Sequence, residues 1–153
     1  MFKLINVENN IELEMVVAGY QFPNSIDDNW CNIKIFIKQA DAIFKIVDPA
    51  LKTTELKIIH EWFKCLAERR LPNYAQLCFI EPCLEFEFLA CTNDTVRISI
   101  NLDHEMKPDF VMTQFGISTL EWSMVFELSK QNIDKITSGI EDALKSYPVR
   151  GKS

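Results

Sequence analysis

Histidine and glycine are scarce in this chain, with two and four residues respectively among 153. Loops that hold nucleotide cofactors are rich in glycine, and neither the Gly-x-Gly-x-x-Gly pattern nor the Walker pattern occurs here. The pair His60-Glu61 lacks the second histidine of the helical zinc motif, so a metal site rich in histidine is excluded. The sequence therefore predicts no cofactor and no metal site.

The chain also lacks a long apolar run and any Cys-x-x-Cys pair. No segment reaches the roughly 18 apolar residues that a membrane-spanning helix requires. The first residues meet Glu8 too early to form a secretory signal. The five cysteines are an odd number, which favours reduced and mostly buried thiols over a disulfide framework. We therefore expect a cytoplasmic protein that makes no contact with membranes.

Basic residues are outnumbered, because 16 Lys and Arg stand against 22 Asp and Glu and give a net charge of −6. Nucleic-acid binding depends on clustered Lys and Arg, so direct contact with nucleic acid is not expected. An acidic surface suits a basic protein partner, although mild acidity also serves solubility alone. The hydrophobic fraction of 48% and the length are typical of one globular domain.

Alternation of apolar and polar residues, the pattern of a strand with one buried face, dominates the chain. Such alternation is typical of antiparallel sheets that are covered on one side only. It occurs in segments 11–17, 33–37, 44–47, 84–88, 96–102 and 120–128.

Helical spacing of apolar residues occurs twice. The first helix is predicted from residue 54 to about 69, with Thr53 or Thr54 as its N-cap. The second is predicted over 129–146, with Ser129 as a natural N-cap.

These elements predict an α+β fold of two layers. We expect one mostly antiparallel sheet of about six or seven strands, with two helices packed on one face and with Trp62 and Trp122 in the core. A single domain would span residues 1–148, and residues 149–153 would form a C-terminal tail. The uncovered face of the sheet is expected to be net negative. Its charged residues would be Glu12, Glu14, Lys34, Lys38, Glu85, Glu87, Arg97, Glu121 and Glu127.

The triplet Asp103-His104-Glu105 places a histidine between two carboxylates, a composition from which a general base can be built. The side chains of adjacent residues rarely point toward one centre. No sequence motif marks a Ser or Cys as a catalytic nucleophile. We therefore interpret the triplet as part of a long solvated loop, residues 103–116, and expect no enzymatic activity.

Two further segments precede predicted strands. Pro82 has no amide proton and should mark a strand entrance, an edge or a bulge, beside an acidic ridge of Glu81, Glu85 and Glu87. In Asp27-Asp28-Asn29-Trp30, the Asx residues favour a turn and the tryptophan is expected to anchor that turn in the core.

In this layout, the chain resembles the Wap-type immunity proteins of bacterial toxin–immunity systems. The entrance at 27–30 leads into the strand at 33–35, and the strand at 44 and the helix at 55–66 follow. The entry Glu81-Pro82-Cys83-Leu84 is the most distinctive matching element. The strand at 122–128 and the helix at 133–144 complete the match, which covers roughly residues 11–147.

This resemblance implies a small cytosolic antidote that binds a cognate toxin domain, secreted or delivered by cell contact. Such toxins are often RNases that act on tRNA. The resemblance implies no catalytic residues. Nuclease toxins tend to be basic, so occlusion by an acidic partner is the expected mechanism. We expect the contact residues to be Asp27, Asp28, Glu81, Glu85, Glu87, Asp103 and Glu105.

Two alternatives stay open at this stage. The chain could be a non-catalytic module without a toxin partner, either one that binds other proteins or one that self-associates, for example as a homodimer. It could also be an enzyme of unfamiliar type that uses Asp103, His104 and Glu105. A deep pocket that gathers these three side chains would favour the enzyme.

Overall fold

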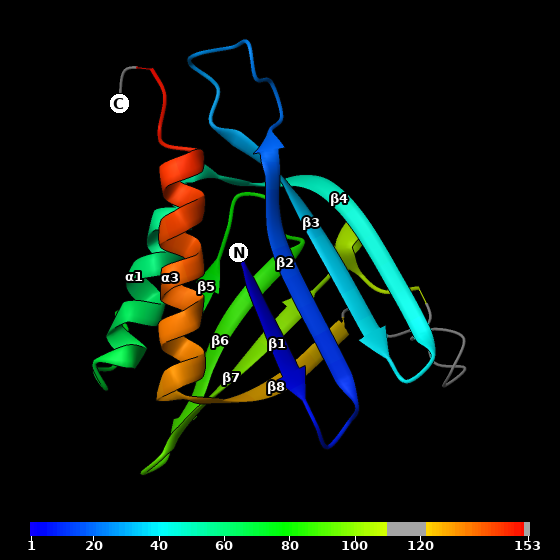
Figure 1. Cartoon of the computed structure of the whole chain (residues 1–153), viewed down its shortest axis with the longest axis vertical. Coiled ribbons are helices and arrows are strands. Elements are labelled where there is room, and N and C mark those ends of the chain that lie inside the picture. The colour runs from blue at the N-terminus through cyan, green and yellow to red at the C-terminus, as the bar shows by residue number, and fades with distance from the viewer. Residues whose placement is uncertain (110–121, 152–153) are drawn as a thin grey trace.

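The structure is a computed structural model that describes residues 1–109 and 122–151 (Figure 1). Most strands follow the predicted alternation, and each hairpin turn falls where the alternation breaks. The elements in chain order are β1 (Phe2–Asn6), β2 (Ile11–Tyr20), β3 (Trp30–Gln39), β4 (Ala42–Lys52), α1 (Thr53–Ala67), β5 (Gln76–Cys78), β6 (Leu84–Cys91), β7 (Thr95–Leu102), the 3-10 helix η1 (His104–Met106), β8 (Trp122–Ser129) and α3 (Lys130–Ser146).

The described strands form two four-stranded antiparallel sheets, in the orders β1-β2-β3-β4 and β5-β6-β7-β8. The fold class is α+β as expected, but the prediction of one sheet of six or seven strands is wrong. Helix α1 separates the two meanders along the chain, and β1 contacts β8 without forming a ladder with it. Large twisted sheets commonly split in this way, because two packed sheets bury both apolar faces.

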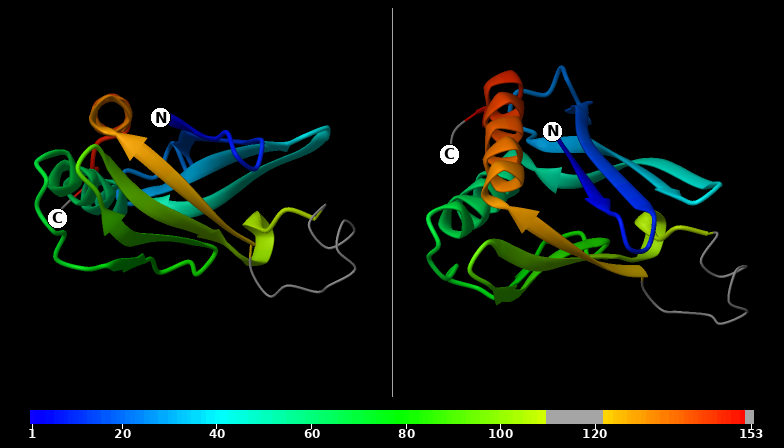
Figure 2. Two further views of the ribbon diagram at one scale, coloured as in Figure 1. Left: turned by 90° about the horizontal axis from the view of Figure 1, so that it is seen from below. Right: turned by 60° about the horizontal axis from the view of Figure 1, so that its bottom comes forward.

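Both sheets and both helices contribute to one cluster of buried side chains. Figure 2 shows the two sheets as separate layers with α1 and α3 along one side of them. An aromatic group joins the layers: the ring centroid of Phe63 on α1 lies 6.1 Å from that of Phe2 and 5.7 Å from that of Phe86. Trp62 and Trp122 are both buried, which confirms their predicted place in the core.

The predicted N-cap is wrong for α1 and correct for α3. The N-cap of α1 is Lys52, not Thr53 or Thr54, because β4 runs directly into the helix. Buried Glu55 stabilises this start: its carboxylate accepts the Lys52 backbone N–H at 2.9 Å and that of Ile80 at 3.1 Å. Ser129 caps α3 as predicted, because its hydroxyl accepts the Asn132 N–H at 3.2 Å.

Gly139 lies inside α3, where glycine costs about 1 kcal/mol relative to alanine. A Cβ atom at this position would lie 1.7 Å from the backbone oxygen of Met1. The absence of a side chain therefore lets α3 pack directly against the start of the chain.

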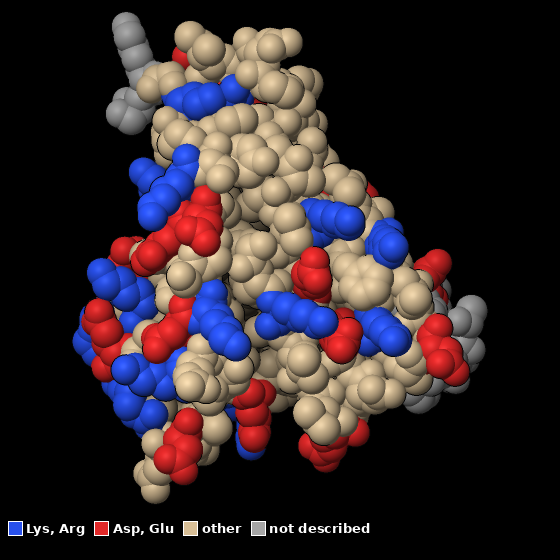
Figure 3. Space-filling view, viewed as in Figure 1, with Lys and Arg blue, Asp and Glu red and all other residues tan. Residues whose placement is uncertain are grey.

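The charged residues predicted for one net-negative face are divided between two. The outer face of the β1–β4 sheet carries four lysines with two glutamates, and Figure 3 shows basic and acidic side chains scattered among uncharged residues over these strands. The outer face of the β5–β8 sheet carries three glutamates and one arginine. The prediction is wrong because alternation identifies the faces of a strand, not the neighbours of that strand. Glu121 lies outside the described residues. The two sets are Lys3, Glu12, Glu14, Lys34, Lys38 and Lys45 on the first face, and Glu85, Glu87, Arg97 and Glu127 on the second.

The cysteines are more exposed than expected. Cys31 and Cys83 are buried, whereas Cys78 and Cys91 are exposed and Cys65 is intermediate. All five are free thiols. The prediction of mostly buried cysteines is therefore wrong, because Cys78 lies on a short edge strand and Cys91 lies where β6 ends at a hairpin turn.

Candidate interaction surface

Polar side chains on the outer face of the β5–β8 sheet form a hydrogen-bonded network around Glu85. The amide of Asn101 donates to the Glu85 carboxylate at 3.0 Å, and Gln76 donates to the same oxygen. Ser99 and Ser123 donate to the Asn101 side-chain oxygen at 2.8 and 2.6 Å. All these donors are neutral. The Glu85 carboxylate is therefore held in position by neutral partners and not by a positively charged one.

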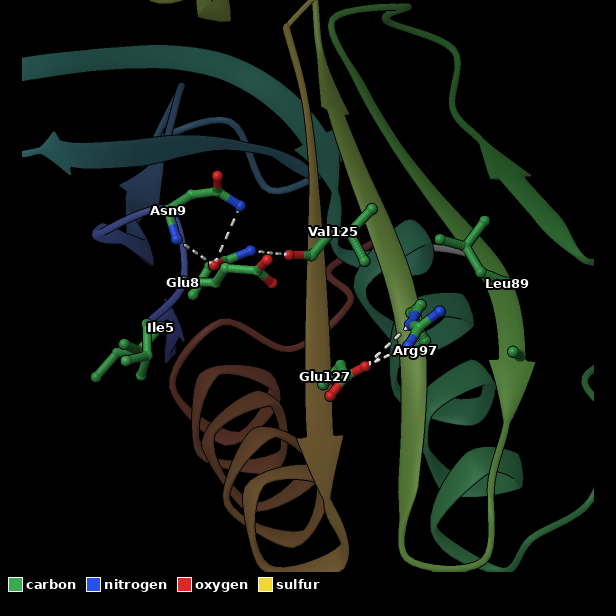
Figure 4. A pocket seen from close by; sticks show the side chains of 10 residues that line it. Ile5, Glu8, Asn9, Leu89, Arg97, Val125 and Glu127 are labelled. Carbon is green, nitrogen blue, oxygen red and sulfur yellow. Dashed lines mark hydrogen bonds and ion pairs between the residues drawn. The ribbon is translucent and has the colours of Figure 1, made fainter.

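The same outer face continues into a hollow, called the trough below, with a volume of about 750 Å³. In Figure 4, Ile5, Glu8 and Asn9 lie on one side of β8 and Leu89 lies on the other. Val125 on β8 is paired through Ser99 with Glu87, so the trough adjoins the acidic ridge of β6. Its lining residues are Ile5, Asn6, Val7, Glu8, Asn9, Leu89, Ala90, Arg97, Val125 and Glu127.

One wall of the trough is the β1–β2 turn, and Asn6 fixes it in place. The Asn6 side-chain amide donates to the Val125 backbone oxygen at 2.6 Å. Its side-chain oxygen accepts the Asn9 backbone N–H at 2.9 Å. Asn10 completes the turn with a positive φ of 53°, a conformation that asparagine adopts more readily than most residues. The wall belongs to the β1–β4 sheet but is fastened to the edge of the other sheet.

Arg97 and Glu127 pair across β7 and β8 on the floor of the trough. The Arg97 guanidinium donates twice to one carboxylate oxygen of Glu127. The two side chains remain 46% and 54% exposed, so this ion pair contributes about 1 kcal/mol or less. It can therefore exchange partners at low cost.

A second group of carboxylates lies at the seam between the sheets, where β4 contacts η1. Burial raises the pKa of Asp48, and the nearby charges of Glu105 and Glu81 raise it further. Burial is the main cause that raises the pKa of the Cys83 thiol to about 12, and the charge of Asp48 is the second. The predicted residues Glu81 and Glu105 thus lie near enough for their charges to act on Asp48. Sequence reasoning missed Asp48, since its neighbours come from distant segments.

The triplet at 103–105 has a structural role in part. The Asp103 carboxylate accepts the His104 backbone N–H at 2.8 Å and caps η1. The His104 and Glu105 side chains are exposed. The remainder of the predicted loop, residues 110–116, lies outside the described residues.

Asp27 and Asp28 lie in the β2–β3 loop, away from the other predicted contact residues. The Asp28 carboxylate accepts the Trp30 backbone N–H at 2.9 Å, which confirms the predicted turn. Trp30 is only half-buried, with the Lys52 ammonium 5.1 Å from its ring centroid, so its predicted place in the core is wrong. It lies where the exposed β2–β3 loop ends and β3 begins.

The C-terminal segment fastens this loop. The Arg150 guanidinium lies 3.6 Å from the centroid of the Tyr20 ring. It donates to the backbone oxygens of Pro23 at 2.8 Å, Phe22 at 3.1 Å and Asp28. Strand β2 has 10 residues and spans about 30 Å, with this loop at one end and the trough wall at the other. The loop and the trough are therefore separate surfaces.

Among the helices in the described ranges, none combines the length and apolarity that a membrane crossing requires. Within the same residues, no group of three or more His, Cys, Asp or Glu side chains is arranged to hold a metal ion.

Comparison with known proteins gives one match. The model of the immunity protein WapI-like family matches residues 3–148, nearly the whole chain. Searches of curated proteins and of solved structures give no match.

Proposed function

The chain belongs to the immunity protein WapI-like family, and on that premise we propose that it binds and neutralises a cognate bacterial toxin domain by occlusion. The family match over residues 3–148 is the observation that carries this proposal. No bond is made or broken in the proposed mechanism, which requires only that the bound chain cover the functional surface of the toxin.

We propose a nuclease, such as one that cleaves tRNA, as the toxin. Nucleases that bind a phosphate backbone present clustered Lys and Arg. The net charge of −6 and the three glutamates on the outer β5–β8 face favour a basic partner of this kind. Complementary charge accelerates encounter and rejects wrong partners.

The outer β5–β8 face is the surface that we assign to the toxin. Glu85 and Glu87 lie on it, and Glu81, Asp103 and Glu105 follow at or beside the seam. Neutral hydrogen bonds hold Glu85, so little side-chain entropy is lost when it meets a cation. Asp27 and Asp28 lie about 30 Å away along β2, at the end of that strand opposite the trough wall, and we do not assign them to this surface.

The neutralised toxin would be met inside the cell, and we place the chain in the cytoplasm on this ground. In this proposal, one toxin domain binds the exposed acidic surface of one chain. Self-association is not required by the mechanism, and the mass of the free chain in solution tests for it.

The proposal is tested by measuring association between the purified chain and the toxin domain encoded beside it, at low and at physiological salt. We expect association that slows as salt rises, since the Debye length falls to about 8 Å. Glu87→Gln on the outer β5–β8 face should slow association several-fold. The control, Glu14→Gln on the outer β1–β4 face, should leave the rate unchanged. No association of the wild-type chain would contradict the proposed function. Equal loss in both variants would contradict the assigned face.

A further inference from the structure

We propose that the trough is the anchor site of the interface, and that it takes an apolar side chain of the toxin flanked by a lysine or arginine. This inference rests on the proposed function, which it deepens by stating the chemistry of the contacting patch. Acidic side chains alone increase the association rate and orient the partner. The lifetime of the complex depends instead on a few buried anchor residues.

Half of the ten residues that line the trough are apolar, and the other half are polar or charged. Four aliphatic side chains around it are exposed to water: Ile5 by 52%, Val7 by 86%, Leu89 by 40% and Val125 by 37%. Strand β6 has a bulge between Phe88 and Ala90, and Leu89 lies there. Apolar surface gathered in a hollow with a polar rim is typical of binding sites, unlike apolar residues scattered singly.

The charged residues at the rim of the trough determine which toxin residue is expected beside the apolar anchor side chain of the toxin. Glu8 and Glu127 contribute two carboxylates, and Arg97 contributes the one guanidinium of the lining. Because Glu127 is held only by an exposed ion pair with Arg97, an incoming arginine or lysine can share its carboxylate at small cost. Glu87 on β6 lies two strands away from Val125, with Ser99 of β7 between them, and adds a further carboxylate on that side. The rim is thus complementary to a basic patch.

The trough is also formed before any partner binds. Two hydrogen bonds of Asn6, to Val125 and from Asn9, hold the turn that makes its wall. A preformed hollow avoids the ordering cost of assembling a wall during binding. This rigidity is the property that we expect of an anchor site, because the apolar side chain then enters without rearrangement of either sheet.

A second copy of this chain is a weaker fit as the occupant. It could bring its lysine-bearing β1–β4 face to the acidic rim, but such a contact uses two different surfaces. Contacts of this kind do not close unless the rotation forms a ring, and they otherwise propagate into filaments. The free chain should therefore remain monomeric.

The test uses neutral substitutions, so that the charge complementarity stays constant. Val125→Gln and Leu89→Gln place a polar amide in the trough, while Val47→Gln makes the same change on the outer face of β4, where Val47 is 54% exposed. Binding to the toxin domain encoded beside the gene is measured by calorimetric titration. Thermal melting checks that each variant is folded.

We expect Val125→Gln and Leu89→Gln each to weaken binding by about 10-fold to 100-fold, the range of hot-spot losses. Val47→Gln should bind within about 3-fold of wild type, as residues outside the interface do. If the wild-type chain binds and all three variants bind equally well, the trough inference is overturned while the proposed function stands. If the wild-type chain does not bind, both fail. A free chain that is dimeric, and that Val125→Gln makes monomeric, assigns the trough to a second copy and also overturns the inference.

Discussion

The side-chain amide of Asn6 donates to the backbone oxygen of Val125 at 2.6 Å, across 119 positions of sequence. This bond links β1, an edge strand of one sheet, to β8, an edge strand of the other. The two strands form no backbone ladder with each other. It also places the β1–β2 turn over the outer β5–β8 face, where it becomes a wall of the trough. One hydrogen bond thus connects the arrangement of the sheets to the proposed binding surface.

Asn6→Ala should therefore affect both stability and binding. Loss of its two bonds, to Val125 and from Asn9, should lower the free energy of unfolding by about 1–2 kcal/mol, since each hydrogen bond typically contributes roughly 1 kcal/mol net. The loosened wall should also weaken toxin binding. Asn24→Ala is the matched control, because Asn24 is exposed in the β2–β3 loop, at the end of β2 opposite the trough. Urea unfolding and calorimetric titration measure the two effects. Unchanged affinity in Asn6→Ala would show that the wall is not part of the interface.

Arg150→Ala should lower stability without changing toxin binding. The substitution removes the stacking on Tyr20 and the bonds to the carbonyls of the β2–β3 loop, and we expect a loss of roughly 1–2 kcal/mol of stability. Backbone amides of residues 21–29 should exchange faster with solvent. Toxin affinity should not change, since β2 separates this loop from the trough by about 30 Å.

Arg150→Lys is the informative companion variant. It keeps the positive charge but loses the planar donor geometry, so its stability should lie between those of Arg150→Ala and wild type. A clear loss of toxin binding in either variant would return Asp27 and Asp28 to the interface.

The seam predicts a dependence of stability on pH. The folded state raises the pKa of Asp48 above its ordinary value of 3.8, so it binds the proton more tightly than the unfolded state does. Stability contributed by this group is therefore lost as the pH rises from that value through the raised pKa. Asp48→Asn removes the partly buried charge and should raise the urea midpoint at about pH 7, with a smaller gain at about pH 4.

Asp134→Asn, on the exposed side of α3, is the control for this series and should leave the midpoint nearly unchanged at both values. A destabilised Asp48→Asn variant at neutral pH would show that the Asp48 carboxylate makes a favourable contact that outweighs its burial. Neither burial nor the charges of Glu105 and Glu81 would then be the dominant influence on this carboxylate.

The sequence predicted the elements better than their assembly. Ser129 was identified as a cap because the bond it makes lies within its own helix turn. Thr53 was misread because the cap of α1 depends on Glu55, which also holds Ile80 from a distant loop. Strand β1 was missed, because five residues give a short alternation and Ile5 adds an apolar residue to its outer side.

The candidate site was predicted only in part for the same reason. Glu85 and Glu87 share a strand, so their common face followed from alternation. The proximity of Asp48 to Glu105 depends on the packing of β4 against η1, and local sequence carries no signal for it. The trough depends on the contact between two sheets that were expected to be one. A longer-range contact such as that of Asn6 with Val125 has no local pattern.

The central claim is neutralisation, and it is tested most directly by titrating the purified chain into a cleavage assay of the toxin domain encoded beside it, with total tRNA as substrate. The account predicts that cleavage falls linearly with added chain and stops at one chain per toxin domain, with no chemical change in either protein. Full cleavage at a large excess of folded chain would contradict it.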